Sequence, residues 1–153
     1  MAISPFLLFL LFDEPAIEVT GSAPLDYLWY FLPAGYLVTI LIETPILLFG
    51  LPPKLTLKQK ALCGVWLTAC TYPVVVLVLP MIFLNSPRGL YIFVAEIFAP
   101  LAECFLFWVT FRTNDVKLNR KDWIRSMIAI IVANLASFGL GEILNRFGWF
   151  GLF

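Results

Sequence analysis

Long apolar stretches separated by short polar segments dominate the pattern of this chain. A helix needs about 20 apolar residues to cross a hydrocarbon core of ~30 Å. Four stretches are long enough, and they predict membrane-spanning helices at 27–51, 61–84, 90–111 and 123–144. Pro52 and Pro53 end the first stretch, and the Asn, Ser, Pro and Gly of 85–89 are typical of a tight turn. The pattern therefore predicts an all-α integral membrane protein, with its four transmembrane helices in a bundle.

Composition excludes the main alternatives to a membrane protein. Hydrophobic residues make up 61% of the chain and charged residues 13%, with a mean hydropathy of +0.94. A soluble domain carries about 25% charged residues, and a disordered chain is poorer in apolar residues. We expect one transmembrane domain over 27–153, preceded by a non-cytoplasmic segment at 1–26. The apolar stretch 3–12 is too short to span, and it is either a short interfacial docking helix or a signal peptide.

Basic residues predict the orientation. Most of them lie in or beside two of the predicted loops, 52–60 and 112–122: Lys54, Lys58, Lys60, Arg112, Lys117, Arg120, Lys121 and Arg125. The positive-inside rule places both loops in the cytoplasm and both termini on the other side of a bacterial-style inner or plasma membrane. Four of these residues are also candidates for contact with anionic lipid head groups: Lys117, Arg120, Lys121 and Arg125. The positive-inside rule alone also accounts for them.

The two halves of the chain resemble each other weakly. Each half has a helix with a glutamate, Glu43 or Glu103, then a basic loop and a helix with a polar middle. When Lys60 is aligned with Ile124, residues 69–73 fall on 133–137. This leaves open two tandem helical hairpins in the same orientation, related by an axis along the membrane normal.

Polar side chains within the spans are the main candidates for function. A charged residue at the centre of a membrane helix costs about 2.5–3.5 kcal/mol on insertion scales. Such positions therefore mark either internal hydrogen bonding or a path for an ion, a proton or a polar solute. The candidates are Glu43, Glu96, Glu103, Asn134, Thr39, Thr71 and Ser137. Because Glu43 and Glu103 are at similar depth, we expect at least one of them to be protonated at neutral pH.

Small residues share helical faces with these polar groups. Gly64, Thr68 and Thr71 form one such stripe, and comparable stripes occur in the other spans. Small residues let membrane helices approach closely. The predicted helix-packing positions are Gly35, Gly64, Ala133 and Gly141.

Little in the sequence indicates catalysis. There is no histidine, and Cys63, Cys70 and Cys104 lie in apolar runs without metal-binding or redox spacing. We therefore expect no enzyme activity, catalytic residue, metal or cofactor. Zero net charge gives no reason to expect nucleic-acid binding.

Three function classes remain for such a chain. The favoured one is a non-catalytic accessory, structural or assembly subunit of a larger membrane complex, with the bilayer and other membrane subunits as partners. The second is an oligomeric transport or channel component, whose partners would be copies of itself. It would move protons, cations or a small solute past Glu43, Glu96, Glu103 and Asn134. A membrane enzyme acting on lipid is the least favoured, because its polar groups would be expected near the head-group plane.

Overall fold

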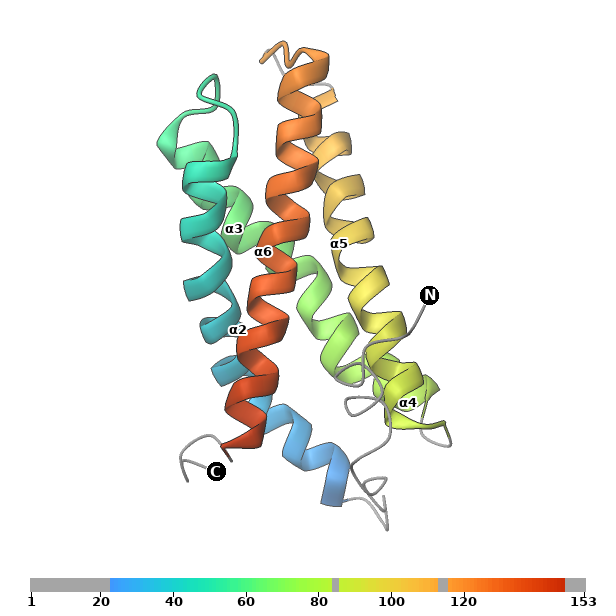
Figure 1. Cartoon of the computed structure of the whole chain (residues 1–153). Coiled ribbons are helices and arrows are strands. Elements are labelled where there is room, and N and C mark those ends of the chain that lie inside the picture. Colours follow the sequence, from blue (N-terminus) through green and yellow to red (C-terminus); the bar gives the residue numbers. More distant parts are fainter. Residues whose placement is uncertain (1–22, 84–85, 113–115, 148–153) are drawn as a thin grey trace, which may run out of the picture.

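The computed structural model describes residues 23–83, 86–112 and 116–147, and this part of the chain is helical (Figure 1). Helices cover 87% of the described residues, and none of these residues is in a strand. Four helical stretches are long and apolar enough to cross a membrane: Leu32–Gly50, Leu57–Ile82, Gly89–Arg112 and Arg120–Leu144. Among the described residues, the structure therefore has four helices long and apolar enough to span, near the four predicted stretches. The predicted N-terminal segment 1–26 lies outside the described residues except for 23–26, which are helical.

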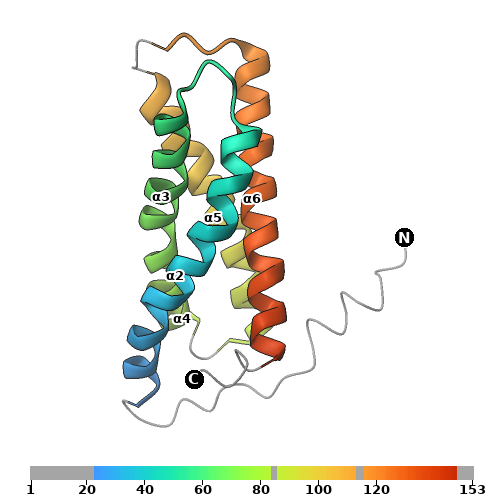
Figure 2. The ribbon, with the colours of Figure 1, turned by 90° about the vertical axis from the view of Figure 1, so that its left-hand side faces the viewer.

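The long helices run beside one another, and each packs on two of the others (Figures 1 and 2). They are α2 (Ala23–Gly50), α3 (Leu57–Pro73), α5 (Arg88–Arg112) and α6 (Arg120–Arg146). α2 and α5 each contact both α3 and α6. In Figure 2, α2 crosses the face of the molecule from α6, near the loop that joins α2 to α3, toward α4 at the other end. The tilt of α2 decides which of its residues can touch α6.

Three helices, α2, α3 and α6, begin about one turn before the predicted starts at 27, 61 and 123, and capping side chains extend α3 and α6. Thr56 and Gln59 form a capping box, in which each side chain bonds the other residue's backbone N–H. Asn119 and Asp122 make the same reciprocal pair at the start of α6. Each pair satisfies two N–H groups that a helix start leaves without partners. The first turns of α3 and α6 therefore include lysines that the sequence pattern assigned to loops.

Beyond α3 the helix widens where prolines interrupt it. A π-helical turn, η1 (Val74–Val78), follows Pro73 and leads into α4 (Leu79–Ile82). The N–H of Leu79 bonds the carbonyl of Val74, five residues back. In that register the carbonyl of Val75 would need the N–H of residue 80, which is a proline and has none. The Tyr91 hydroxyl donates to the Val75 carbonyl instead (3.1 Å), so α5 satisfies the group that Pro80 leaves free.

The apolar core lies toward the two basic loops. Its members are Leu47, Leu51, Leu55, Cys63, Leu67, Phe107, Phe111, Ala129, Ile130 and Ala133. Basic side chains close this end. The Lys60 ammonium donates to the carbonyls of Leu48 (3.2 Å) and Leu51 (2.9 Å), at the end of α2. A cation near a helix C-terminus contributes about 0.3–1 kcal/mol. Lys54 pairs with Asp122 (2.6 Å) and joins the first loop to α6.

Candidate functional site

Two glutamates from different helices are buried in the middle of the protein. Glu43 comes from α2 and Glu103 from α5, and each side chain is only 2% exposed. The two carboxyl groups are close enough to interact electrostatically. The two glutamates that the sequence places at similar depth are therefore neighbours in the structure.

Each glutamate is hydrogen-bonded to the same two helices, α3 and α6. Glu43 Oε2 lies 2.7 Å from Thr68 Oγ1, and its Oε1 lies 2.7 Å from Ser137 Oγ. Glu103 Oε1 lies 2.8 Å from Thr71 Oγ1, and the Asn134 amide donates to its Oε2 (2.7 Å). Both oxygens of both carboxyl groups are thus satisfied by side chains from neighbouring helices.

These contacts close a circuit through all four long helices. Glu43 bonds Thr68 on α3, and Thr71 on the same helix bonds Glu103. Asn134 and Ser137 on α6 then connect Glu103 back to Glu43. We call this set the glutamate ring: Glu43, Thr68, Thr71, Glu103, Asn134 and Ser137. Thr68, Thr71, Glu103 and Asn134 are all buried. The ring fixes the depth and rotation of each helix relative to its two neighbours.

Three hydroxyls of the ring also contact carbonyls of their own helices. Thr68 Oγ1 lies 2.7 Å from the Gly64 oxygen, and Ser137 Oγ lies 2.9 Å from the Asn134 oxygen. Thr71 Oγ1 lies 3.1 Å from the Leu67 oxygen. A hydroxyl has one proton and donates to one acceptor at a time. Each hydroxyl therefore either donates to its glutamate, or donates to the backbone while accepting from a protonated glutamate.

Of the polar residues predicted as candidates, five lie in the ring and two do not. Thr39 is half-buried on α2, one turn from Glu43, and takes no part in the ring. Glu96 is also half-buried, and it interacts electrostatically with Glu142 on α6 rather than with the ring. Thr68 was identified only as part of a small-residue stripe. Its spacing from Gly64 and Thr71, which places all three on one helical face, is the signal that could have identified it.

Three of the four small residues predicted as packing positions lie close to another helix or in the core. A Cβ added to Gly35 would collide with the Tyr72 hydroxyl, and one on Gly64 would lie 2.9 Å from the Thr44 Cα. Ala133 is fully buried in the core. Gly141 differs from them, because a Cβ there would meet no described atom within 4 Å. α2 has already diverged from α6 at that height (Figure 2).

One close approach was not predicted from the sequence. A Cβ on Gly50 would lie 2.6 Å from the Ala129 Cβ, so the end of α2 rests directly on α6. Arg125 strengthens the same contact. Its Nε donates to the Gly50 carbonyl (2.7 Å), and its Nη2 donates to the Phe49 carbonyl (3.0 Å). Arg125, predicted as a lipid contact, thus also caps α2, while Lys117, Arg120 and Lys121 are exposed.

Within the described ranges, no three His, Cys, Asp or Glu side chains are grouped so that they could hold a metal ion. The chemistry of the ring is that of carboxyl, hydroxyl and amide groups, which exchange protons and hydrogen bonds. Comparisons with protein-family models, with curated proteins and with solved structures find no match for this chain. The part of the chain that the structure describes is all-helical, with four helices long and apolar enough to cross a membrane.

Proposed function

We propose that the four helices form a transmembrane bundle that serves as a non-catalytic subunit or assembly partner in a larger membrane complex. The glutamate ring carries this proposal. All four carboxyl oxygens of Glu43 and Glu103 have partners within the chain. The most costly polar groups of the spans are therefore used to hold the helices together.

The outward faces fit this role. Large apolar side chains are exposed on every long helix, including Leu41, Phe49, Trp66, Leu101, Phe105 and Leu135. Such faces suit both lipid and the apolar surface of another membrane subunit. A subunit whose buried carboxyl groups are satisfied internally needs no polar partner for them, and it can bind through apolar packing.

The proposal is tested by extracting the protein from its native membrane with a mild detergent or polymer and measuring the mass of the intact complex. We expect the chain to migrate in a hetero-complex well above its own 17.3 kDa. A stable monomer would contradict the assembly role, and a homo-oligomer would favour transport instead.

A second candidate is a transport component that uses the ring for protons or cations. The pair of Glu96 and Glu142 favours it, because this pair lies on α5 and α6 between the ring and the end away from the basic loops. In an oligomer these groups would extend a polar path toward that end. Under this candidate, Glu103→Gln leaves assembly intact but abolishes transport into proteoliposomes. Under the favoured one, the same variant changes neither property.

The ring also supports a tandem repeat of two hairpins, in a corrected register. Exchanging α2 with α5 and α3 with α6 maps Glu43 on Glu103. It also maps Thr68 on Asn134 and Thr71 on Ser137, and each hydrogen bond of the ring then falls on another. The alignment made from sequence alone is two residues out of this register, because it pairs Asn134 with Cys70.

For orientation, we propose that the loops at 51–56 and 113–119 face the cytoplasm and that both termini face the other side. Single-cysteine variants at Asn119 and at Ser86, made in a chain without the three native cysteines, test this with a membrane-impermeant maleimide. Asn119→Cys should react from the cytoplasmic side only. Reaction of Ser86→Cys from that side would reverse the topology.

A further inference from the structure

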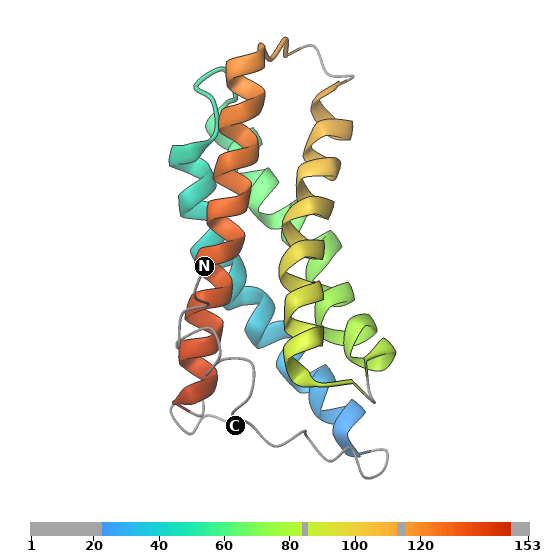
Figure 3. The ribbon, with the colours of Figure 1, turned by 45° about the vertical axis from the view of Figure 1, so that its right-hand side comes forward.

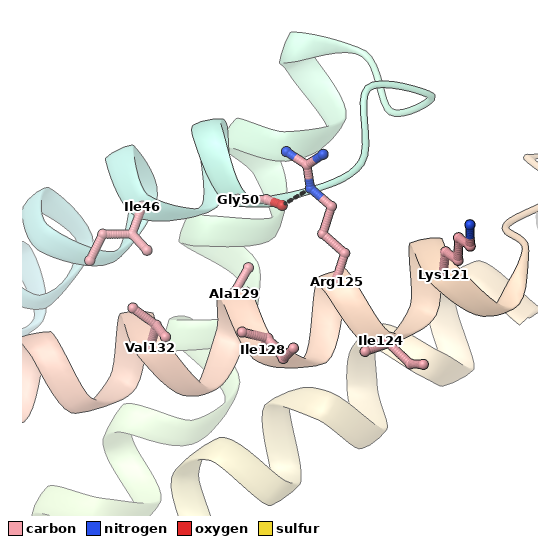
Figure 4. A pocket seen from close by; sticks show the side chains of 8 residues that line it. All are labelled: Ile46, Gly50, Lys121, Ile124, Arg125, Ile128, Ala129 and Val132. Carbon is pink, nitrogen blue, oxygen red and sulfur yellow. Dashed lines mark hydrogen bonds between the residues drawn. The ribbon is translucent and has the colours of Figure 1, made fainter.

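A groove runs along the outer surface between α2 and α6, at the end that carries the basic loops (Figure 4). Its volume is about 510 Å³. The residues that line it are Ile46 and Gly50 of α2, and Lys121, Ile124, Arg125, Ile128, Ala129 and Val132 of α6. It is distinct from the glutamate ring, because it shares no residue with it and opens on the outer surface.

The two ends of the groove differ in chemistry. Lys121 and Arg125 lie one helical turn apart at the end near the loops, as Figure 4 shows. The rest of the lining is apolar, and Ile128 and Val132 are each about half exposed (56% and 48%). Arg125 has five N–H donors, and its bonds to described residues use Nε and Nη2. The Nη1 group of Arg125, together with the Lys121 ammonium, can therefore bind an anion.

The groove is long enough for one lipid chain. From Lys121 to Val132 the helix rises about 16 Å, which is about half of a ~30 Å hydrocarbon core. An acyl chain that lies along this part of α6 therefore stays within one leaflet.

We propose that this groove binds an anionic phospholipid of the leaflet next to the basic loops. The phosphate lies between Lys121 and Arg125, and one acyl chain lies against Ile124, Ile128 and Val132. Both cations are held at the start of α6, and Arg125 is further oriented by its bonds to the end of α2. The site therefore recognises a negative charge at head-group depth together with an apolar chain beneath it.

Native mass spectrometry of the whole protein, titrated with dioleoylphosphatidylglycerol or dioleoylphosphatidylcholine, tests the head-group part. The wild type should retain the anionic lipid in preference to the zwitterionic one. Lys121→Gln should weaken retention of phosphatidylglycerol about fivefold, the effect of one basic residue near a membrane surface. Arg120→Gln removes the same charge one residue away, outside the groove, and should bind as the wild type does.

A second pair of variants tests the binding of the acyl chain. Ile128→Trp fills the groove without changing charge and should abolish preferential retention. Ile131→Trp places the same bulk at an exposed position outside the groove (Ile131 is 42% exposed) and should not. Glycerol 3-phosphate alone should bind far more weakly than the lipid.

Three results would each overturn the site: equal retention of the two lipids, equal effects of Lys121→Gln and Arg120→Gln, or unchanged binding by Ile128→Trp. A second protein copy held in place of the lipid would overturn it as well.

Discussion

Replacing Gly64 with leucine is expected to destabilise the protein by about 3 kcal/mol or more, at the upper end of what overpacking costs in a closely packed core. α3 approaches α2 so closely here that even a Cβ would collide with the Thr44 hydroxyl and lie 2.9 Å from its Cα. The obstacle is partly backbone, so rotation of a side chain cannot relieve it. The two helices would have to separate, and the bond between Thr68 and Glu43 one turn away would lengthen. Thermal unfolding in detergent measures the loss.

Gly141→Leu is the matched control for this prediction. A Cβ there meets no described atom within 4 Å, and leucine favours a helix over glycine by roughly 0.8 kcal/mol. The control should therefore unfold at or slightly above the wild-type temperature. Equal melting temperatures for the two leucine variants would mean that the close contact between α2 and α3 is absent from the folded protein.

The contrast between these glycines shows what helical periodicity can and cannot predict. Ala133, Ser137 and Gly141 lie on one stripe of α6, and the sequence pattern predicted close packing along all of it. Ala133 is fully buried, but Gly141 meets nothing within 4 Å among the described atoms. The pattern gives the face of a helix but not its tilt. α2 crosses away from α6, so the contact ends partway along the stripe (Figures 2 and 3).

Helix ends show a similar limit. Hydropathy finds the four described helices that could cross a membrane, because each apolar run is long enough to cover a bilayer. It starts two of them too late, since Lys58 and Lys121 are polar but lie in first turns stabilised by capping boxes. The signal was present as Thr56 followed three residues later by Gln59, a typical start of a helix.

For the glutamate ring, the sequence predicted the members better than their partners. Burial of Glu43, Glu103 and Asn134 follows from their position deep within apolar spans. Which glutamate bonds which residue depends on helix tilt and on the relative height of α3 and α6, and neither can be read from one chain's periodicity. The register that we propose for the two halves, two residues from the alignment made on sequence alone, depends on the same geometry.

The number of protons available to the hydrogen bonds around Glu103 bears on whether this carboxyl group is charged. Two side chains make four contacts here. Thr71 contacts the Glu103 carboxyl group and the Leu67 carbonyl, and Asn134 contacts the same carboxyl group and the Ile130 carbonyl. The amide supplies two protons and the hydroxyl one. If Glu103 is protonated, its own O–H supplies the proton that is otherwise missing. If it is ionised, one contact lacks a proton, and no basic side chain of the ring faces the charge.

Glu103→Leu is expected to destabilise the protein by about 1–2 kcal/mol, whereas Glu103→Gln should remain close to the wild type. Leucine removes two interhelical hydrogen bonds and leaves one N–H of Asn134 buried without its partner. Hydrogen bonds between membrane helices average about 0.6 kcal/mol each, and an unsatisfied buried donor adds to that loss. Glutamine can accept from Asn134 with its oxygen and donate to Thr71 with its amide, as a protonated glutamate does. Unfolding of the two variants in the same detergent gives the comparison.

Infrared spectroscopy tests the protonation itself, independently of stability. At neutral pH the wild type should show the carbonyl stretch of a protonated carboxyl group, above the amide bands, and the double variant Glu43→Gln with Glu103→Gln should lack it. Glu96→Gln is the control, because Glu96 lies outside the ring, and its loss should leave the band of Glu43 or Glu103 in place. A wild type without such a band would have both ring glutamates ionised. Two negative charges would then share a buried site whose partners are hydroxyls and an amide, and burial at such a cost requires a compensating cation. That outcome would replace the structural role of the ring with ion binding and favour the transport candidate over the assembly subunit.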